Sequence, residues 1–227
     1  MNATEDLNWV DSPAALESCV ERLKAVKALG LDAGLDFHGR LHKPMAKQLA
    51  KALEPHKPLF IEEPLLVEHP EGLKQLSNLT TIPIALGERL YHRWDAKRFL
   101  EEGMIDILQP DIAHAGGVSE TKRLANMAEA YDVAIAPHCP LGPIAFAASL
   151  HVGLSTPNFV ILEMSLGMHY NVEVRGGLSC RQKNSFLLTI NIGGRHRLEH
   201  IPQGSIRVRD TRGLRQSTAG SRTWYRD

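Results

Sequence analysis

Short apolar runs that end in a polar residue recur along most of the chain. Six runs show this pattern, at 31–36, 58–62, 82–88, 105–111, 133–138 and 159–163. Their end points are 26, 26, 23, 27 and 25 residues apart, which is room for a buried strand, a loop and a covering helix. The pattern therefore predicts a repeat of strand and helix.

The segments between these runs have the spacing of helices. Before the first run, Ser12 and Pro13 supply an N-cap and a first-turn proline, and Gly30 can end the helix. Further helices are predicted at about 44–53, 72–76, 93–102, 119–131 and 143–152.

Buried strands with helices between them require parallel crossover connections, which leaves a doubly wound sheet or a (β/α)₈ barrel. A doubly wound sheet gathers its ligands at one switch point, so only a few strand ends would carry chemistry. Here all six ends are polar, and in a barrel the strand ends surround one axis. We therefore expect an α/β fold, a partial TIM-type barrel with about six of the eight parallel strands recognisable.

Composition excludes several other classes of protein. The chain has 227 residues, of which 43% are hydrophobic and 23% charged, as in ordinary globular domains. Lys and Arg together number 26, as do Asp and Glu, so no net field favours nucleic acid or an anionic membrane. Three dispersed cysteines, an acidic N-terminus and the lack of an apolar stretch of ~20 residues favour a soluble, cytoplasmic protein.

The charge is balanced only in sum. Residues 1–171 carry a net charge of −7, whereas residues 172–227 carry +7 and are rich in Gly, Ser and Arg. We therefore expect a barrel domain at 1–171 and a separate basic tail at 172–227.

Three consecutive predicted strands end in carboxylates, Asp36, Glu62 and Glu88. In a barrel these groups would lie close together, and like charges ~4 Å apart repel by about 4 kcal/mol at an effective dielectric near 20. Either proton uptake or a divalent cation must compensate this repulsion. Because the donors are all oxygens, the sequence predicts a Mg²⁺ site; ordinary polar strand ends are the alternative.

Two histidines are candidates for acid–base chemistry. His38 lies two residues beyond Asp36 and would point to the same side if the strand continued, while His138 ends a strand on the opposite wall. Such a pair could act as acid and base on opposite faces of one substrate. Solvated loop histidines are the alternative, because the chain has 11 histidines.

Two further acids complete the candidate site. Asp111 ends the strand that precedes the strand of His138, so it can hydrogen-bond the imidazole of His138; a helix cap is the alternative. Glu163 lies in an apolar run, so its pKa should rise if it faces the pocket; an outward-facing acid is the alternative. The Lys and Arg side chains of 1–171 are interpreted as solvated helix faces, and Cys139 is not assigned as a nucleophile.

Six ordered motifs carry a family resemblance. They are LDFHGR (35–40), FIEEP (60–64), ALGERL (85–90), QPDIAHAGG (109–117), APHCPLGP (136–143) and EMSLGMHYN (163–171). Over about residues 2–171 they resemble the barrel domain of the enolase superfamily, within its mandelate racemase-like branch. The resemblance implies Mg²⁺-dependent elimination of water from a small-molecule sugar acid. The balanced charge adds the expectation of no nucleic-acid or membrane partner.

The resemblance also implies roles for the candidate residues. Asp36, Glu62 and Glu88 would hold the Mg²⁺ ion. His138, oriented by Asp111, would remove the proton beside the substrate carboxylate.

Two remaining roles follow from the same resemblance. His38 would protonate the departing 3-hydroxyl, and Glu163 would hydrogen-bond the enediolate oxygen.

Family members also carry a capping domain and two earlier barrel strands, which we do not find in this sequence. We therefore weigh three alternatives: an active dehydratase, a dehydratase for another aldonic acid, and a truncated, non-catalytic barrel fragment. Whether the protein forms a homo-oligomer is left open by the sequence.

Overall fold

The computed structural model describes residues 7–166 and 186–190. Five parallel strands form one sheet: β1 Leu35–Asp36, β2 Ile61–Glu62, β3 Ile84–Leu86, β4 Ile107–Leu108 and β5 Ala134–Ile135. Their order in the sheet is their order in the sequence. A doubly wound sheet would reverse its strand order at a switch point, so this order favours the barrel arrangement and confirms the predicted α/β fold class.

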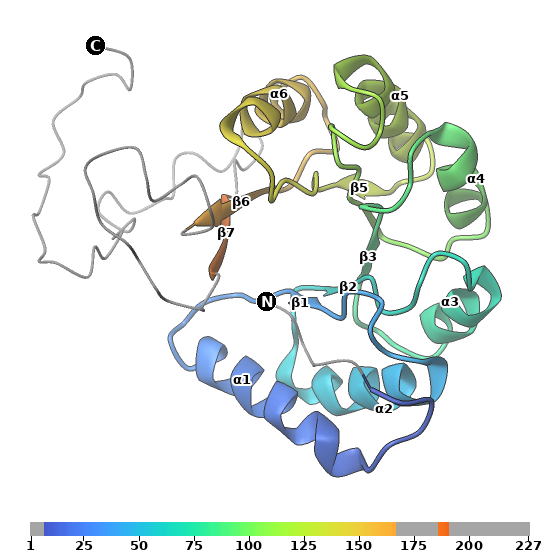
Figure 1. The fold of residues 1–227 in the computed structure, drawn as a ribbon, viewed down its shortest axis with the longest axis vertical. Helices are drawn as coiled ribbons and strands as arrows, with labels where there is room; N and C mark the ends of the chain where they lie inside the picture. Colours follow the sequence, from blue (N-terminus) through green and yellow to red (C-terminus); the bar gives the residue numbers. More distant parts are fainter. Residues whose placement is uncertain (1–6, 167–185, 191–227) are drawn as a thin grey trace, which may run out of the picture. The chain divides into compact units, whose positions relative to one another are not determined.

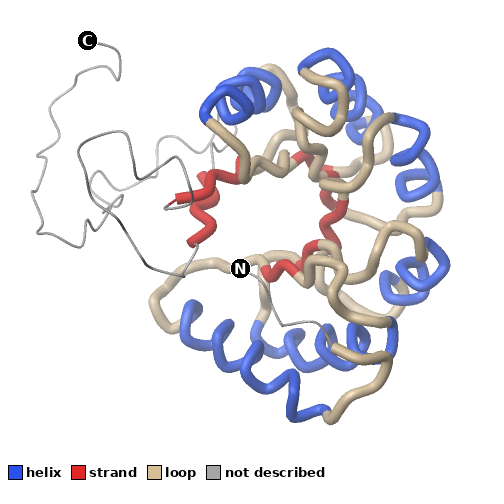
Figure 2. The backbone as a smooth tube through the Cα atoms, viewed as in Figure 1, coloured by secondary structure: helices blue, strands red, loops and turns tan. Residues whose placement is uncertain are grey.

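The helices alternate with the strands and lie around the outside of the sheet (Figures 1 and 2). They are η1 Pro13–Leu16, α1 Glu17–Lys27, α2 Lys43–Leu53, η2 Glu54–His56, α3 Pro70–Ser77, α4 Arg93–Glu101, α5 Val118–Glu129 and α6 Pro143–Leu154. The first begins as predicted, with the Ser12 hydroxyl accepting a hydrogen bond from the Ala14 N–H.

The core lies between the sheet and this layer of helices. On α2, Met45, Leu49 and Leu53 recur every four residues and are fully buried, in one cluster with Leu35 of β1 and Ile61 of β2. Burying a side chain of this size stabilises the fold by about 1.5–3 kcal/mol. This packing holds the strand ends in place.

Gly87 allows β3 and β4 to approach each other closely. It follows β3, has φ +151, and a Cβ atom built on it would lie 2.7 Å from the backbone nitrogen of Gln109. A side chain has no room there, because the obstacle is backbone. The glycine therefore brings the residues that follow β3 and β4 together.

The sixth predicted strand differs from the prediction. It contributes one parallel bridge, between Phe159 and Ile135, after which β6 (Leu162–Leu166) pairs antiparallel with β7 (Phe186–Ile190). Backbone groups of a strand must find partners, and those of β6 find them in β7 instead of β5. In the described part of the chain the parallel sheet thus has five strands and does not close into a ring.

The predicted boundary between 171 and 172 lies outside the described residues, as does the basic tail apart from β7. Among the helices that the structure describes, none is both long and apolar enough to span a membrane.

Candidate active site

The carboxylates of Asp36 and Glu62 lie on neighbouring strands at the same level. Asp36 of β1 pairs in register with Glu62 of β2, which places their side chains on one face of the sheet. Glu62 is 6% exposed, and Gln109 hydrogen-bonds its carboxylate. Burial, followed by the negative charges of Asp36 and Glu163, raises the pKa of Glu62 to about 8. A raised pKa favours proton uptake by Glu62, which is one of the two ways to relieve the predicted repulsion.

His38 reaches the site through a turn and not through a continued strand. Its φ is +55, its N–H donates to Oδ1 of Asp36 at 2.6 Å, and its Nδ1 lies 2.9 Å from Oδ2 of Asp36. A short acidic side chain readily closes such a turn. The strand therefore does not continue to His38, but the imidazole still lies beside Asp36. The hydrogen bond to Asp36 raises the pKa of His38.

Glu88 lies between the two predicted acid–base histidines. Its Oε2 is 3.1 Å from Nε2 of His138, and its Oε1 is 3.9 Å from Nδ1 of His38. Burial raises the pKa of Glu88, but the hydrogen bond and charge of His138 outweigh burial and lower it overall. Both imidazoles therefore face one carboxylate.

Asp111 holds His138 from the other side of the ring. Both residues lie beyond the ends of β4 and β5, yet Nδ1 of His138 is 2.8 Å from Oδ2 of Asp111. Asp111 is itself fixed, because its Oδ1 accepts the Ala113 N–H at 2.7 Å. Burial lowers the pKa of His138, but hydrogen bonds to Asp111 and Glu88 raise it to about 10. The predicted imidazole–carboxylate pair is thus formed.

Glu163 closes the cluster from β6. Its Oε2 accepts the Cys139 N–H at 2.7 Å and lies 3.9 Å from Nε2 of His138. Burial is the main cause that raises its pKa, as expected for a carboxylate in an apolar setting. Burial also raises the pKa of the Cys139 thiol to about 11, which keeps it protonated and unreactive.

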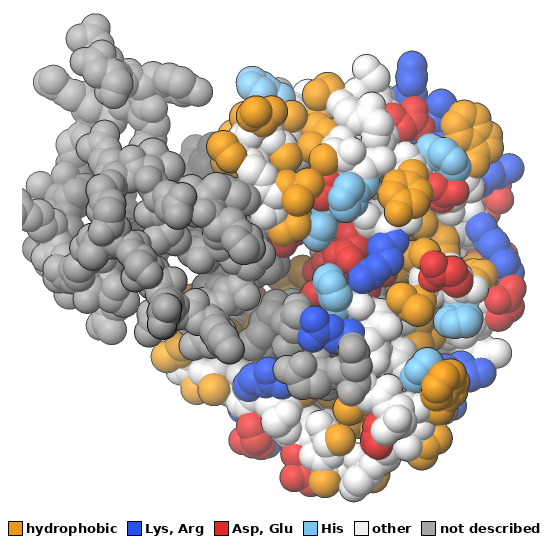
Figure 3. Space-filling model, in the orientation of Figure 1, with side chains coloured by type: hydrophobic (Ala, Val, Ile, Leu, Met, Phe, Trp, Pro, Cys, Tyr) orange, Lys and Arg blue, Asp and Glu red, His pale blue; other side chains and the backbone are white. Residues whose placement is uncertain are grey.

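Figure 3 shows histidine, acidic and basic side chains gathered near the middle of one face, inside the arc of helices. The structure thus brings all seven predicted residues into one network of contacts and charges: Asp36, His38, Glu62, Glu88, Asp111, His138 and Glu163.

Sequence reasoning missed two charged residues and one histidine of this network. The sequence predicts a solvated side chain for Arg89, but its Nη1 lies 3.0 Å from Oε1 of Glu88 and 2.9 Å from Oε2 of the buried Glu63. Nδ1 of His114 lies 3.1 Å from the backbone oxygen of Glu88. Two features of the sequence could have revealed these residues. Arg89 directly follows the predicted ligand Glu88, and Glu63 is the second acid of the FIEEP motif.

The donor set fits Mg²⁺, although its present arrangement is not that of a formed site. Among residues 7–166 and 186–190, no group of three or more His, Cys, Asp or Glu side chains is arranged to hold an ion. The chemistry of the donors nevertheless suits a hard cation, because Asp36, Glu62 and Glu88 offer oxygens only.

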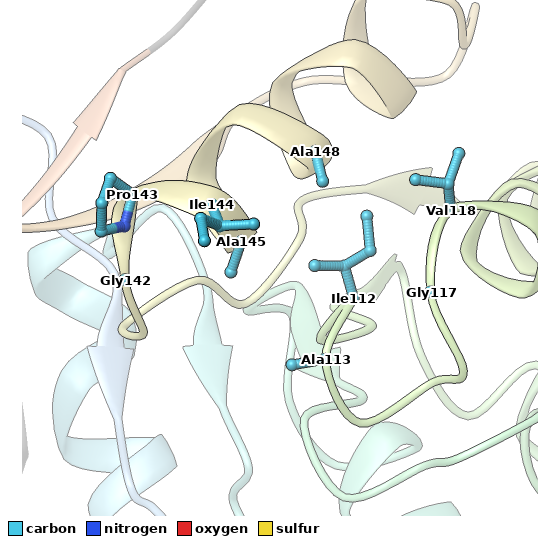
Figure 4. A pocket seen from close by; sticks show the side chains of 9 residues that line it. All are labelled: Ile112, Ala113, Gly117, Val118, Gly142, Pro143, Ile144, Ala145 and Ala148. Atoms are coloured by element: carbon cyan, nitrogen blue, oxygen red, sulfur yellow. The ribbon is translucent and has the colours of Figure 1, made fainter.

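A pocket of about 490 Å³ adjoins this cluster (Figure 4). It lies between the loop after β4 and the beginning of α6, and Ile112, Val118 and Ile144 are among its apolar lining residues. None of the seven predicted residues lines it, so the reactive groups are those of the carboxylate–histidine cluster and not of this pocket.

The family model described as "Enolase C-terminal domain-like" matches residues 4–188. The chain therefore belongs to the enolase C-terminal domain-like family, which confirms the resemblance of its motifs.

Curated relatives are similar over most of this chain. A D-galactonate dehydratase of Variovorax paradoxus (strain S110) is 52% identical over 174 residues, which are 75% of this chain and 46% of the relative. The D-galactonate dehydratase of Ralstonia nicotianae is 51% identical over the same lengths. This chain thus spans about half the length of the curated relatives it matches.

Solved structures agree with the fold. A member of the enolase superfamily from Salmonella Typhimurium matches with a TM-score of 0.65 and 34% identity, covering 72% of this chain and 42% of that one. A mandelate racemase/muconate lactonizing enzyme from Sulfitobacter sp. matches with a TM-score of 0.67 and 31% identity, covering 71% and 43%.

Proposed function

We propose that the protein is a Mg²⁺-dependent dehydratase of sugar acids, with D-galactonate as its first candidate substrate. The observation that carries the proposal is the position of His138, whose two ring nitrogens face Asp111 and Glu88 at 2.8 and 3.1 Å. An imidazole held in this way, beside three strand-end carboxylates, suits proton abstraction next to a substrate carboxylate. The similarity to two D-galactonate dehydratases supports the choice of substrate.

Asp36, Glu62 and Glu88 would hold the ion. Bound Mg²⁺ supplies positive charge that makes the α-proton of a carboxylate more acidic and stabilises the resulting dianion. The side chains themselves perform the proton transfers.

His138 would be the general base. Asp111 holds its Nδ1, which fixes the tautomer and directs Nε2 toward Glu88. Hydrogen bonds to Asp111 and then to Glu88 raise the pKa of His138 to about 10. A protonated imidazole cannot accept a proton, so the contact between Nε2 and Glu88 has to be released before Nε2 acts. The α-proton of the sugar acid then passes to Nε2.

His38 and Glu163 would act on the oxygens of the substrate. Asp36 orients His38 through two contacts, and the imidazole would donate a proton to the 3-hydroxyl as it departs. Glu163 is a buried acid whose raised pKa favours the protonated form, which can donate a hydrogen bond to the enediolate oxygen. Loss of water then gives the enol, which tautomerises to the 2-keto-3-deoxy acid as the proton of the 2-hydroxyl is lost and C3 gains one.

The proposal also includes a cellular compartment for the protein. Cys19 and Cys139 are free thiols, which suits a reducing, cytoplasmic compartment. A homo-oligomer, and the lack of nucleic-acid or membrane partners, stay predictions.

A non-catalytic barrel that still binds Mg²⁺ is the second candidate function. It is favoured by the parallel sheet of the described residues, which has five strands and an unpaired edge at β1.

One assay separates the candidates. The full chain is incubated with Mg²⁺ and D-galactonate, then with a panel of other aldonic acids, and the 2-keto-3-deoxy product is measured. Turnover of D-galactonate is the expected result, and turnover of a different acid alone would shift the proposal to that substrate. A folded protein that binds Mg²⁺ but dehydrates nothing would leave the non-catalytic candidate.

A further inference from the structure

One guanidinium connects the ends of three strands. Nη1 of Arg89 lies 2.9 Å from Oε2 of Glu63 and 3.0 Å from Oε1 of Glu88, and its Nη2 donates to the backbone oxygen of His38 at 3.3 Å. These three groups follow β2, β3 and β1. Arg89 therefore fixes the spacing of the strand ends that carry the predicted Mg²⁺ ligands.

Glu63 is the fixed partner of this guanidinium. Its side chain is fully buried, and its second oxygen, Oε1, accepts the Gly87 N–H at 3.0 Å. Its backbone is held on both sides, because its N–H donates to Ala85 and its oxygen accepts the Gly39 N–H. A buried carboxylate of this kind persists only when it is paired. Glu63 consequently orients Arg89 and is not itself available as a ligand.

The two carboxylate oxygens of Glu88 contact different partners. Oε1 is engaged by the guanidinium, whereas Oε2 lies 3.1 Å from Nε2 of His138, a contact that the proposed proton transfer has to release. Once the contact with His138 is released, Oε2 has no competing partner among the described contacts of Glu88, whereas Oε1 stays hydrogen-bonded to the guanidinium, so Oε2 is the better ligand for a cation. Mg²⁺ requires a small, near-octahedral shell, whereas Ca²⁺ accepts more oxygens and often takes both from one carboxylate.

We propose that Arg89, oriented by Glu63, is a positioning residue that restricts Glu88 to one-oxygen coordination and thereby selects Mg²⁺ over Ca²⁺. The inference rests on the proposed function, because it assigns a role at the same Mg²⁺ site. It adds the cation preference of that site and the pair of side chains that sets it.

The test measures cation binding and needs no substrate. The full chain and its Arg89→Met variant are titrated with MgCl₂ and with CaCl₂ by calorimetry. Loss of a residue that supports a metal ligand typically weakens binding by about 10–100-fold. We expect Arg89→Met to weaken Mg²⁺ binding by roughly tenfold or more and to retain Ca²⁺ binding, so that the Mg²⁺/Ca²⁺ preference falls by the same factor.

Arg93→Met is the matched control. Arg93 pairs with Glu120 at 2.8 Å, between α4 and α5, and contacts none of the predicted ligands in the described part of the chain. This control should leave both cation affinities within about twofold of the wild type, since it removes an ion pair of the same type elsewhere.

A second variant keeps the inference testable if Arg89→Met does not fold. The double variant Glu63→Gln/Arg89→Met removes both charges, so no buried carboxylate is left unpaired, and it should show the same fall in preference. If either folded variant keeps the wild-type preference, the inference is overturned while the proposed function stands. If the wild type itself binds no Mg²⁺, both fall.

Discussion

The Nδ1 atom of His138 lies 2.8 Å from Oδ2 of Asp111, although neither residue belongs to a strand. Each lies in a loop beyond its strand, and the parallel pairing of β4 (Ile107–Leu108) with β5 (Ala134–Ile135) brings the two loops together. The same pairing leaves Nε2 of His138 on the side of Glu88. This relationship makes His138 the best candidate for the base.

Replacing Asp111 with Asn should therefore impair proton abstraction. An amide no longer stabilises the charged ring and can select the wrong tautomer, so α-proton exchange and dehydration should both fall by about 10²–10⁴-fold. Rates of solvent deuterium exchange and of product formation measure this. Asp132→Asn, at an exposed site with φ +58, is the control. A loss smaller than tenfold in Asp111→Asn would remove Asp111 from the mechanism.

His38→Asn should separate two reactions that the wild type couples. The imidazole is assigned to the leaving hydroxyl and not to the α-proton, so exchange of that proton with deuterium should continue while elimination stops. Mass spectrometry of recovered substrate measures exchange, and a keto-acid assay measures elimination. The exposed His151→Asn should change neither. An equal loss of both reactions in His38→Asn would contradict the division of labour.

Gly87→Ala should destabilise the sheet far more than Gly103→Ala. Both glycines have φ between +20° and +160°, but only at Gly87 would the new methyl group meet backbone, 2.7 Å from the Gln109 nitrogen. Gly103→Ala should cost about 1–2 kcal/mol from its backbone conformation alone, and Gly87→Ala should cost clearly more. Urea unfolding measures both. Similar losses would mean that β3 and β4 do not approach so closely.

The buried thiol of Cys19 should make stability depend on pH. Burial raises its pKa to about 11, whereas an unfolded thiol has a pKa near ~8.5. The unfolded chain therefore loses this proton first, so the stabilisation is complete below about pH 8.5 and is lost as the pH rises toward 11. In urea unfolding at pH 8 and pH 10.5, the stability advantage of the wild type over Cys19→Ala should shrink at the higher pH. A constant difference would contradict the burial of this thiol.

The regular part of the site could be predicted from the sequence. The period of about 26 residues placed Asp36, Glu62 and Glu88 at consecutive strand ends, because parallel strands with covering helices repeat at a nearly constant length. It also predicted that Asp111 and His138 come from neighbouring strands. These features depend only on chain order and strand direction.

The irregular part could not be predicted in the same way. His38 adopts φ +55 because Asp36 binds its N–H, and the hydrophobic pattern contains no information on such a turn. The sixth strand pairs with β7 because its backbone groups find partners there, which depends on residues far along the chain. Arg89 was missed because a long side chain contacts groups on other strands, and spacing does not reveal where it reaches.

The central claim is that the carboxylates of Asp36, Glu62 and Glu88 share one divalent cation. Titration of the full chain with Mn²⁺, followed by electron paramagnetic resonance, tests it without any assumption about the substrate. We predict one ion bound per chain, and a loss of affinity of roughly tenfold or more in each of Asp36→Asn, Glu62→Gln and Glu88→Gln. Binding that is absent from the wild type, or unchanged in all three variants, would contradict the account.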